Sequence, residues 1–268
     1  MENKPILKVY TTDVDLLNYT SYQRVNTIEE SDVVFIGGAG TPSSFLFQFE
    51  PLETGYRSNR NVDLLDIKTV MRAITLHKPI IGFARGHLLL SILSGDCDIF
   101  YCNRLPSIRR IEMLDKNLSF RTDRFLIPVP RRGASSYLLA RSSDVRPDFY
   151  QKSKDHDRID ARSFKKGETE ALLHARLSAL SFAFEIDGCS QFAFVKTLID
   201  KFMEREYSDL VTKYQPNDLV ITPQNTTNNY IPNTTNNYID SPFSASFIEE
   251  AIRSLGADMD MDREQQIN

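Results

Sequence analysis

Short apolar runs and one long amphipathic stretch alternate in the first part of the chain. Residues 6–10 and 31–36 are apolar and contain β-branched side chains, as is typical of strands. Apolar side chains recur at helical spacing between residues 63 and 77, and Ile80 and Ile81 then suit a strand covered on both faces. The pattern predicts a β-α-β unit and a parallel, doubly wound α/β sheet, with its site at the carboxyl ends of the strands.

A sharp turn is predicted between the strand at Ile80 and the helix that follows it. Gly82, Ala84 and Gly86 are small enough for the backbone to reverse within a few residues, and residues 88–90 begin an apolar helix face. This is the architecture of a nucleophile elbow, in which strain holds the apex residue clear of the sheet. The apex residue here is Ala84, which has no nucleophile to present.

The second half of the compact region carries fewer signals. Residues 97–167 mix short apolar runs with basic pairs at 109–110 and 131–132, which are expected in solvated loops. Residues 167–174 and 179–185 then predict two strands. An amphipathic helix is predicted over residues 192–207.

The composition changes beyond residue 214, where the α/β domain of residues 1–214 is expected to end. Residues 215–243 form an Asn/Thr-rich linker with a tandem octapeptide, and residues 257–268 form a polar tail. Between them, residues 244–256 predict a short amphipathic helix with one apolar stripe. The helix either docks on its own domain or binds a partner.

Composition and charge exclude several classes of function. Of 268 residues, 41% are hydrophobic and 25% charged, as expected for a globular chain. The formal charge of −4 offers no footprint for nucleic acid or an anionic membrane. The three cysteines lack zinc-site spacing, and no signal peptide or apolar run of spanning length is recognised. We therefore expect a cytoplasmic protein without a metal, a cofactor, a nucleic-acid partner or a membrane.

The elbow and its surroundings resemble the class I glutamine amidotransferase superfamily, most closely its gamma-glutamyl hydrolase or peptidase C26-like branch. Residues 78–87 match that family's Lys-Pro-x-x-Gly-x-Cys-Arg-Gly elbow, with Ala84 in place of the cysteine. Residues 179–185 match its distal Gly-Val-Gln-x-His-Pro-Glu motif, with Ala183 at the histidine and Glu185 at the glutamate. The resemblance covers residues 6–214 and implies a flavodoxin-like fold.

The resemblance also implies where a ligand pocket would lie. Gly37 and Gly38 match the family's Gly-Gly loop, where an oxyanion hole forms, although such glycines also serve plain turns. Arg60 and Asp63 resemble an Arg-Asp feature of the branch. The implied oxyanion or ligand pocket comprises Gly37, Gly38, Arg85 and Gly86.

The missing side chains decide the expected chemistry. The family mechanism needs a thiolate to attack, a histidine to carry the proton and a carboxylate to orient the histidine. Ala84 and Ala183 remove the first two, and Glu185 alone is retained. The sequence therefore predicts a pseudoenzyme that works by binding a glutamine-like ligand or a synthetase or ligase partner.

Three alternatives stay open at this point. The chain could be an active amidotransferase or hydrolase with a relocated nucleophile, supplied by His87, Cys97, Cys102 or Cys189. Ala84 could be an engineered replacement of cysteine in such an enzyme, although Ala183 argues against this because one substitution suffices to inactivate it. Finally, the helix at residues 244–256 could be the working part of an assembly protein.

Overall fold

The structure is a computed structural model. Within the compact unit Met1–Pro223, the structure describes residues 6–13, 22–38, 40–43, 46, 58–102, 107–113, 116–122, 126–131, 134–142, 150–152, 158–159, 168–184 and 192–204. The predicted linker at 215–243, the helix at 244–256 and the tail at 257–268 lie outside the described residues.

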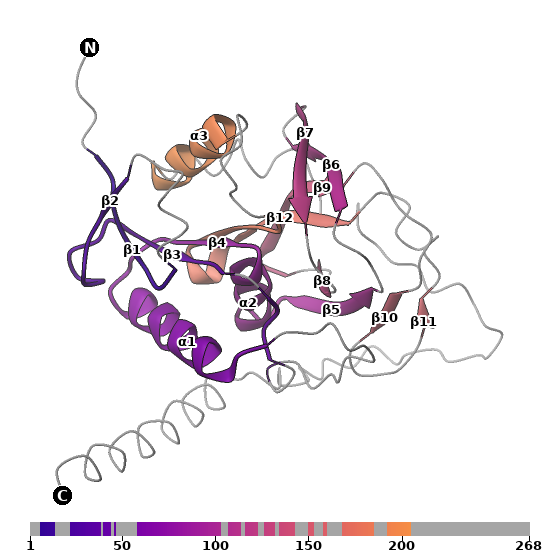
Figure 1. The fold of residues 1–268 in the computed structure, drawn as a ribbon, viewed down its shortest axis with the longest axis horizontal. Coiled ribbons are helices and arrows are strands. Elements are labelled where there is room, and N and C mark those ends of the chain that lie inside the picture. Colours follow the sequence, from indigo (N-terminus) through magenta and orange to yellow (C-terminus); the bar gives the residue numbers. More distant parts are fainter. Residues whose placement is uncertain are drawn as a thin grey trace, which may run out of the picture. The chain divides into compact units, whose positions relative to one another are not determined.

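A nine-stranded sheet forms the centre of the described structure (Figure 1). Its first five strands are all parallel, in the order β2 (Gln23–Arg24), β1 (Lys8–Thr11), β3 (Val33–Ile36), β4 (Ile80–Phe83) and β13 (Ala179–Phe182). This is the 2-1-3-4-5 strand order of flavodoxin-like folds. The predicted α/β, doubly wound, flavodoxin-like architecture is confirmed.

Four antiparallel strands extend the sheet beyond β13. They are β12 (Thr169–His174), β9 (Ser136–Ser142), β6 (Ser107–Met113) and β7 (Lys116–Thr122). The basic pair at 109–110 lies in β6, so its expected placement in a loop was wrong. The long-range pairing of β9 with β12 and β6 left no local signal in the sequence, although β6 and β7 form a hairpin.

A second, four-stranded antiparallel sheet contains β11 (Arg158–Ile159), β10 (Tyr150–Lys152), β5 (Cys97–Cys102) and β8 (Leu126–Pro130). It also falls within the region for which the sequence predicted no element. In the described residues, Arg131 follows β8 directly and its Nε donates to Asp98 at 3.0 Å.

Three helices of the described residues cover the two faces of the parallel strands. Helix α3 (Phe192–Met203) shares an apolar cluster with alternate strand residues such as Phe35, Ile81 and Phe182. The opposite face meets α2 (Arg85–Leu93), and α1 (Arg60–Thr75) contacts β3. Figure 1 shows α1 and α3 on opposite sides of β3 and β4. The sheet is therefore doubly wound, with its core between α3 and the strands.

The boundaries follow local physical causes. The Asn59 side chain accepts hydrogen bonds from the Asn61 and Val62 amides at 3.1 and 3.3 Å, so α1 begins three residues before the predicted start at residue 63. Strand β13 ends at Phe182, before the predicted end at residue 185, and the described residues here end at Phe184, so Glu185 lies outside them. Among the described helices, none is long and apolar enough to cross a membrane.

Candidate functional site

The elbow forms where β4 passes into α2. Ala84 is the residue between them and has φ 47° and ψ −107°, a left-handed conformation that non-glycine residues rarely adopt. Its amide donates to the Phe182 carbonyl at 2.9 Å, and its carbonyl accepts from the His87 amide at 3.1 Å. The backbone geometry of a nucleophile elbow is therefore present, with a methyl group at its apex.

Two glycines of the elbow are required by close contacts. A Cβ at Gly86 would lie 2.1 Å from the Ile36 carbonyl oxygen, and a Cβ at Gly82 would lie 2.6 Å from Leu90 Cδ1. Neither glycine has a positive φ. The first turn of α2 packs directly on the end of β3 and on β4, which leaves no room for a side chain at either position. The turn therefore requires glycine for its size as well as for its flexibility.

Ala183 lies at the same edge of the sheet as Ala84. It follows β13, which runs parallel to β4 with Phe182 opposite Phe83. Ala183 is 3% exposed, and its amide donates to the Glu170 carbonyl at 2.8 Å. The structure thus places the two alanines at the ends of neighbouring parallel strands, while the position of Glu185 is not described.

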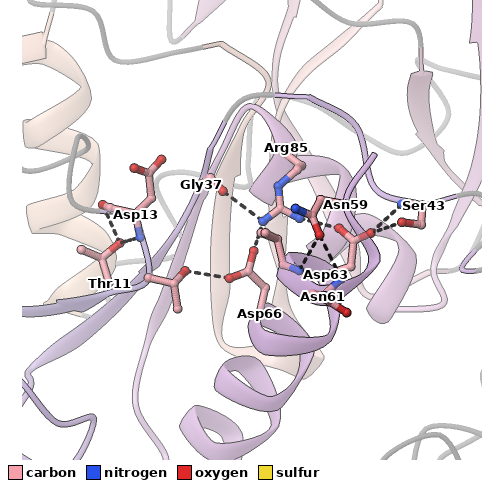
Figure 2. Close-up of polar contacts among 11 residues, drawn as sticks. Thr11, Asp13, Gly37, Ser43, Asn59, Asn61, Asp63, Asp66 and Arg85 are labelled. Carbon is pink, nitrogen blue, oxygen red and sulfur yellow. Dashed lines mark hydrogen bonds and ion pairs between the residues drawn. The ribbon is translucent and has the colours of Figure 1, made fainter. Parts of the chain in front are cut away.

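Arg85, the first residue of α2, is held by two carboxylates of α1 (Figure 2). Its Nη1 lies 2.5 Å from Asp63 Oδ1, and its Nη2 contacts Asp66 Oδ2. The Nη2 group also donates to the Gly37 carbonyl at 3.3 Å. Arg85 is 5% exposed and both aspartates are fully buried. Its positive charge is therefore matched within the protein.

The two aspartates have further partners in neighbouring loops. Asp63 accepts from the Ser43 amide at 2.8 Å and from the Ser43 hydroxyl, and Asp66 accepts from the Thr12 hydroxyl at 2.7 Å. Burial raises the pKa of Asp66 even though Arg85 acts in the opposite direction. The cluster joins α1, the loops after β1 and β3, and the elbow into one buried polar unit.

The glycine loop after β3 lies against this cluster. Gly38 has φ +110°, and a Cβ there would lie 3.6 Å from Asp13 Oδ2 and 3.7 Å from Arg85 Nε. The Gly37 carbonyl accepts from Arg85. The predicted pocket residues Gly37, Gly38, Arg85 and Gly86 are therefore assembled at one edge, as is Asp63, whereas Arg60 is exposed.

His87, a candidate for a relocated base, is fully buried on α2 and its Nδ1 lies 2.8 Å from Ser181 Oγ. The same hydroxyl lies 2.9 Å from His174 Nε2. The sequence reasoning did not identify this histidine pair or Asp66. The available signal was polar residues inside otherwise apolar elements, such as Ser181 in an Ala-Leu-Ser-Phe strand and Asp66 on a buried helix face.

The thiol candidates are only partly described. Cys97 is 6% exposed and forms no disulfide, and burial raises its pKa, so its thiol is protonated at neutral pH. The side chain of Cys102 and all of Cys189 lie outside the described part. Within the described residues, no group of three or more His, Cys, Asp or Glu side chains could hold a metal ion.

Comparisons with known proteins give no sequence match: neither a protein-family model nor a curated protein matches this chain. Among solved structures, it resembles a protein from Thermoplasma acidophilum assigned as a GMP synthase subunit, with 10% identity and a TM-score of 0.48 over 77% of this chain and 98% of the other. It also resembles a glutamine amidotransferase from Thermotoga maritima, with 10% identity and a TM-score of 0.45 over 81% and 89%. At these values the similarities establish neither a family nor an activity.

Proposed function

We propose that the chain is a catalytically inactive member of the class I glutamine amidotransferase-like superfamily, close to its gamma-glutamyl hydrolase or peptidase C26-like branch, and that it acts by binding. The observation that supports this is the elbow itself. The backbone at Ala84 keeps the strained geometry that serves a nucleophile, yet the side chain is a methyl group. Ala183, directly after the neighbouring strand β13, places a second methyl group at the same edge.

The chemistry of amide hydrolysis explains why both positions matter. The reaction needs a nucleophile at the apex and a base that takes its proton, and methyl groups supply neither. Removing the nucleophile of such a catalytic unit typically costs about 10⁴-fold or more in rate. An elbow that persists without its nucleophile is better explained by its structural role, because it positions Arg85 against α1.

The charge balance at this edge favours a protein partner over a small anionic ligand. A glutamine-like molecule carries a carboxylate that a free guanidinium would recognise. Arg85 already faces Asp63 and Asp66, so its charge is not available to such a group. We therefore place a synthetase or ligase partner first and a glutamine-like small ligand second.

An enzyme with a relocated nucleophile is the alternative. Among the residues that could supply its chemistry, His87 is hydrogen-bonded to Ser181, and Cys97 is a buried, protonated thiol. Cys102 and Cys189 remain candidates, and an engineered Ala84 remains the second form of this alternative. Both forms predict hydrolytic activity, either in the unaltered chain or after cysteine is restored at position 84, whereas a binding protein has none.

The deciding experiment measures release of ammonia and glutamate by the full chain from glutamine and from gamma-glutamyl peptides. We expect no release above the buffer rate. The variant Ala84→Cys serves as the comparison, because an enzyme inactivated by an engineered replacement of its cysteine would recover activity on restoration of the thiol alone. Turnover by the unaltered chain that Glu185→Ala abolishes would show that the proposal is wrong.

The binding role has its own test. Affinity capture with the full chain is compared with capture by a variant truncated after Tyr214. We expect both to retain the same synthetase or ligase, since the proposed binding surface belongs to the α/β domain. If only the full chain retains a partner, the C-terminal segment is the working part and the protein belongs to the assembly class.

A further inference from the structure

A continuous chain of five buried polar residues connects the elbow helix with the turn before β5. Asp96 Oδ2 accepts from the Ser136 hydroxyl at 3.1 Å, and Ser136 Oγ lies 2.9 Å from His174 Nδ1. His174 Nε2 lies 2.9 Å from Ser181 Oγ, which lies 2.8 Å from His87 Nδ1. These residues come from five separate segments and are at most 6% exposed.

The hydrogen bonds can be arranged in only one direction along this chain. Ser136 gives its single proton to Asp96, so it must accept from His174 Nδ1–H. The other nitrogen of a neutral His174 then accepts from the Ser181 hydroxyl, and Ser181 in turn accepts from His87 Nδ1–H. Both histidines therefore carry their proton on Nδ1, and the bond from Ser181 to His174 depends on His174 being neutral.

Protonation of His174 breaks this order. With protons on both ring nitrogens, Nε2 can no longer accept from Ser181, whose nearest other acceptor is the Leu172 carbonyl at 3.5 Å. The Ser181 oxygen can accept from both rings, but its own proton is then left with this longer contact alone. A cation would also be placed at a fully buried position, and burial accordingly lowers the pKa of His174 to about 4.

Charged groups near the chain come from several neighbouring elements. Arg176, in the short 3-10 helix η4 (Ala175–Leu177), places Nη1 3.8 Å from Asp96 Oδ1 but is 70% exposed. Strands β13 and β8 carry no titratable side chain. Other charged groups among the described residues of the elements packed here are Glu168 before β12, Glu170 within it and Arg141 at the far end of β9. Arg85 on α2 is paired with Asp63 and Asp66, and the Arg131–Asp98 pair lies beyond Asp96. The Asp96 carboxylate acts to raise the pKa of His174, but the effect of burial is larger.

We propose that the chain from His87 through Ser181, His174 and Ser136 to Asp96 is a proton-responsive clamp on the elbow. At neutral pH it fastens α2 to β12 and β13, which α2 contacts directly. In acid, protonation of the buried His174 removes the hydrogen bond from Ser181, which joins the α2 end of this chain to β12, and lets the first turns of α2 open. This inference concerns the fold and stands whether or not the proposed binding function is correct.

The test is hydrogen exchange of the amides of residues 85–93 in the full chain, corrected for the intrinsic pH dependence of exchange. Between pH 7 and pH 5 we expect the opening equilibrium of this helix to rise roughly 20-fold, as follows from proton uptake by a group that titrates near 6.5 when released. The variant His174→Phe cannot take up the proton and should lose this dependence. The variant His77→Gln, at an exposed histidine, is the matched control and should keep the pH dependence.

A second measurement keeps the inference testable if His174→Phe does not fold. Nitrogen chemical shifts of the histidine rings in the unaltered protein at pH 7 report the tautomers directly, and two buried rings should show Nδ1–H. Nε2–H tautomers, or an opening equilibrium of residues 85–93 that does not change between pH 7 and pH 5, would overturn the proposal. An equal pH dependence in His174→Phe would do so as well, as would an equal rise at the amides of β1 and β3, because the whole fold and not α2 alone would then be opening.

Discussion

Arg85 Nη1 lies 2.5 Å from Asp63 Oδ1, and both side chains are almost completely buried beneath the elbow. The pair links residues 22 positions apart, and Asp66 completes it from the next turn of α1. The residue after the apex therefore serves as an internal counter-charge. This is a structural reason for the elbow to be kept in a chain that has no nucleophile there.

Replacement of this guanidinium should be severely destabilising. Arg85→Met leaves two buried carboxylates without a cation, and breaking such a pair typically costs about 3–5 kcal/mol. We expect a loss of this size in the free energy of unfolding, measured by urea denaturation. Adding Asp63→Asn and Asp66→Asn should recover part of it, because the uncompensated charges are then removed.

The matched control for Arg85→Met is Arg72→Met. Arg72 also contacts a carboxylate, with Nη2 2.6 Å from Glu29 Oε1, but the two side chains are 53% and 51% exposed. Solvent screens such pairs, so we expect no resolvable change in stability. Equal losses in the two variants would contradict the role assigned to the buried Arg85 cluster.

Relief of the backbone strain at the apex should increase the free energy of unfolding, in contrast to the loss expected for Arg85→Met. Ala84 at φ 47° and ψ −107° stores about 1–3 kcal/mol of backbone strain, whereas glycine adopts positive φ readily and loses about 0.5–1 kcal/mol through its flexible unfolded state. Ala84→Gly should therefore stabilise the protein by about 1 kcal/mol, as measured by thermal and urea unfolding. Under the proposed binding function, this change removes no catalytic side chain.

Gly86→Ala tests the same turn from the other side. The added Cβ would meet the Ile36 carbonyl at 2.1 Å, which backbone movement alone can relieve. We expect destabilisation of about 3 kcal/mol or more, since overpacking of a rigid contact commonly costs about 1–3 kcal/mol and here the obstacle is main chain. A neutral Gly86→Ala would show that α2 does not pack against β3 as described.

The elbow could be predicted from the sequence because its signals are local. The apolar run at Ile80, the small residues at 82, 84 and 86 and the apolar helix start lie within eleven positions. The doubly wound sheet followed from the same β-α-β pattern. The partners of Arg85 were only partly visible: Asp63 was noted, whereas Asp66 shares its helix face three residues later and was not.

Features that depend on strand order could not be predicted. Ser136, His174 and Ser181 meet because β9, β12 and β13 are neighbours in the sheet, although they are up to 45 positions apart. Of the strands between residues 97 and 159, β5 pairs with β8 and β10, and β6 pairs with β9, all over long range, and their short apolar runs do not reveal these partners. Polar residues within buried strands were the only available sign of these contacts.

The buried His174 makes stability depend on pH. Its pKa is lowered to about 4 in the folded state from 6.5, so the unfolded chain binds more protons between these values. The stabilising contribution is complete above pH 6.5 and is lost as the pH falls towards 4. Relative to His174→Phe, the free energy of unfolding should fall by about 3 kcal/mol between pH 7 and pH 4, and urea titrations at each pH measure the difference. Parallel pH profiles for the two proteins would contradict the assignment.

The protonated, buried Cys97 predicts how the thiols react. Burial raises its pKa and only 6% of the residue is exposed, so an electrophile reaches it only when the structure opens. In the variant Cys102→Ser/Cys189→Ser, where Cys97 is the one remaining thiol, modification by iodoacetamide at pH 7.5 should be at least about 100-fold slower than in urea. Fast modification of the folded variant would instead identify Cys97 as an accessible nucleophile, and would strengthen the alternative of an enzyme whose nucleophile has moved.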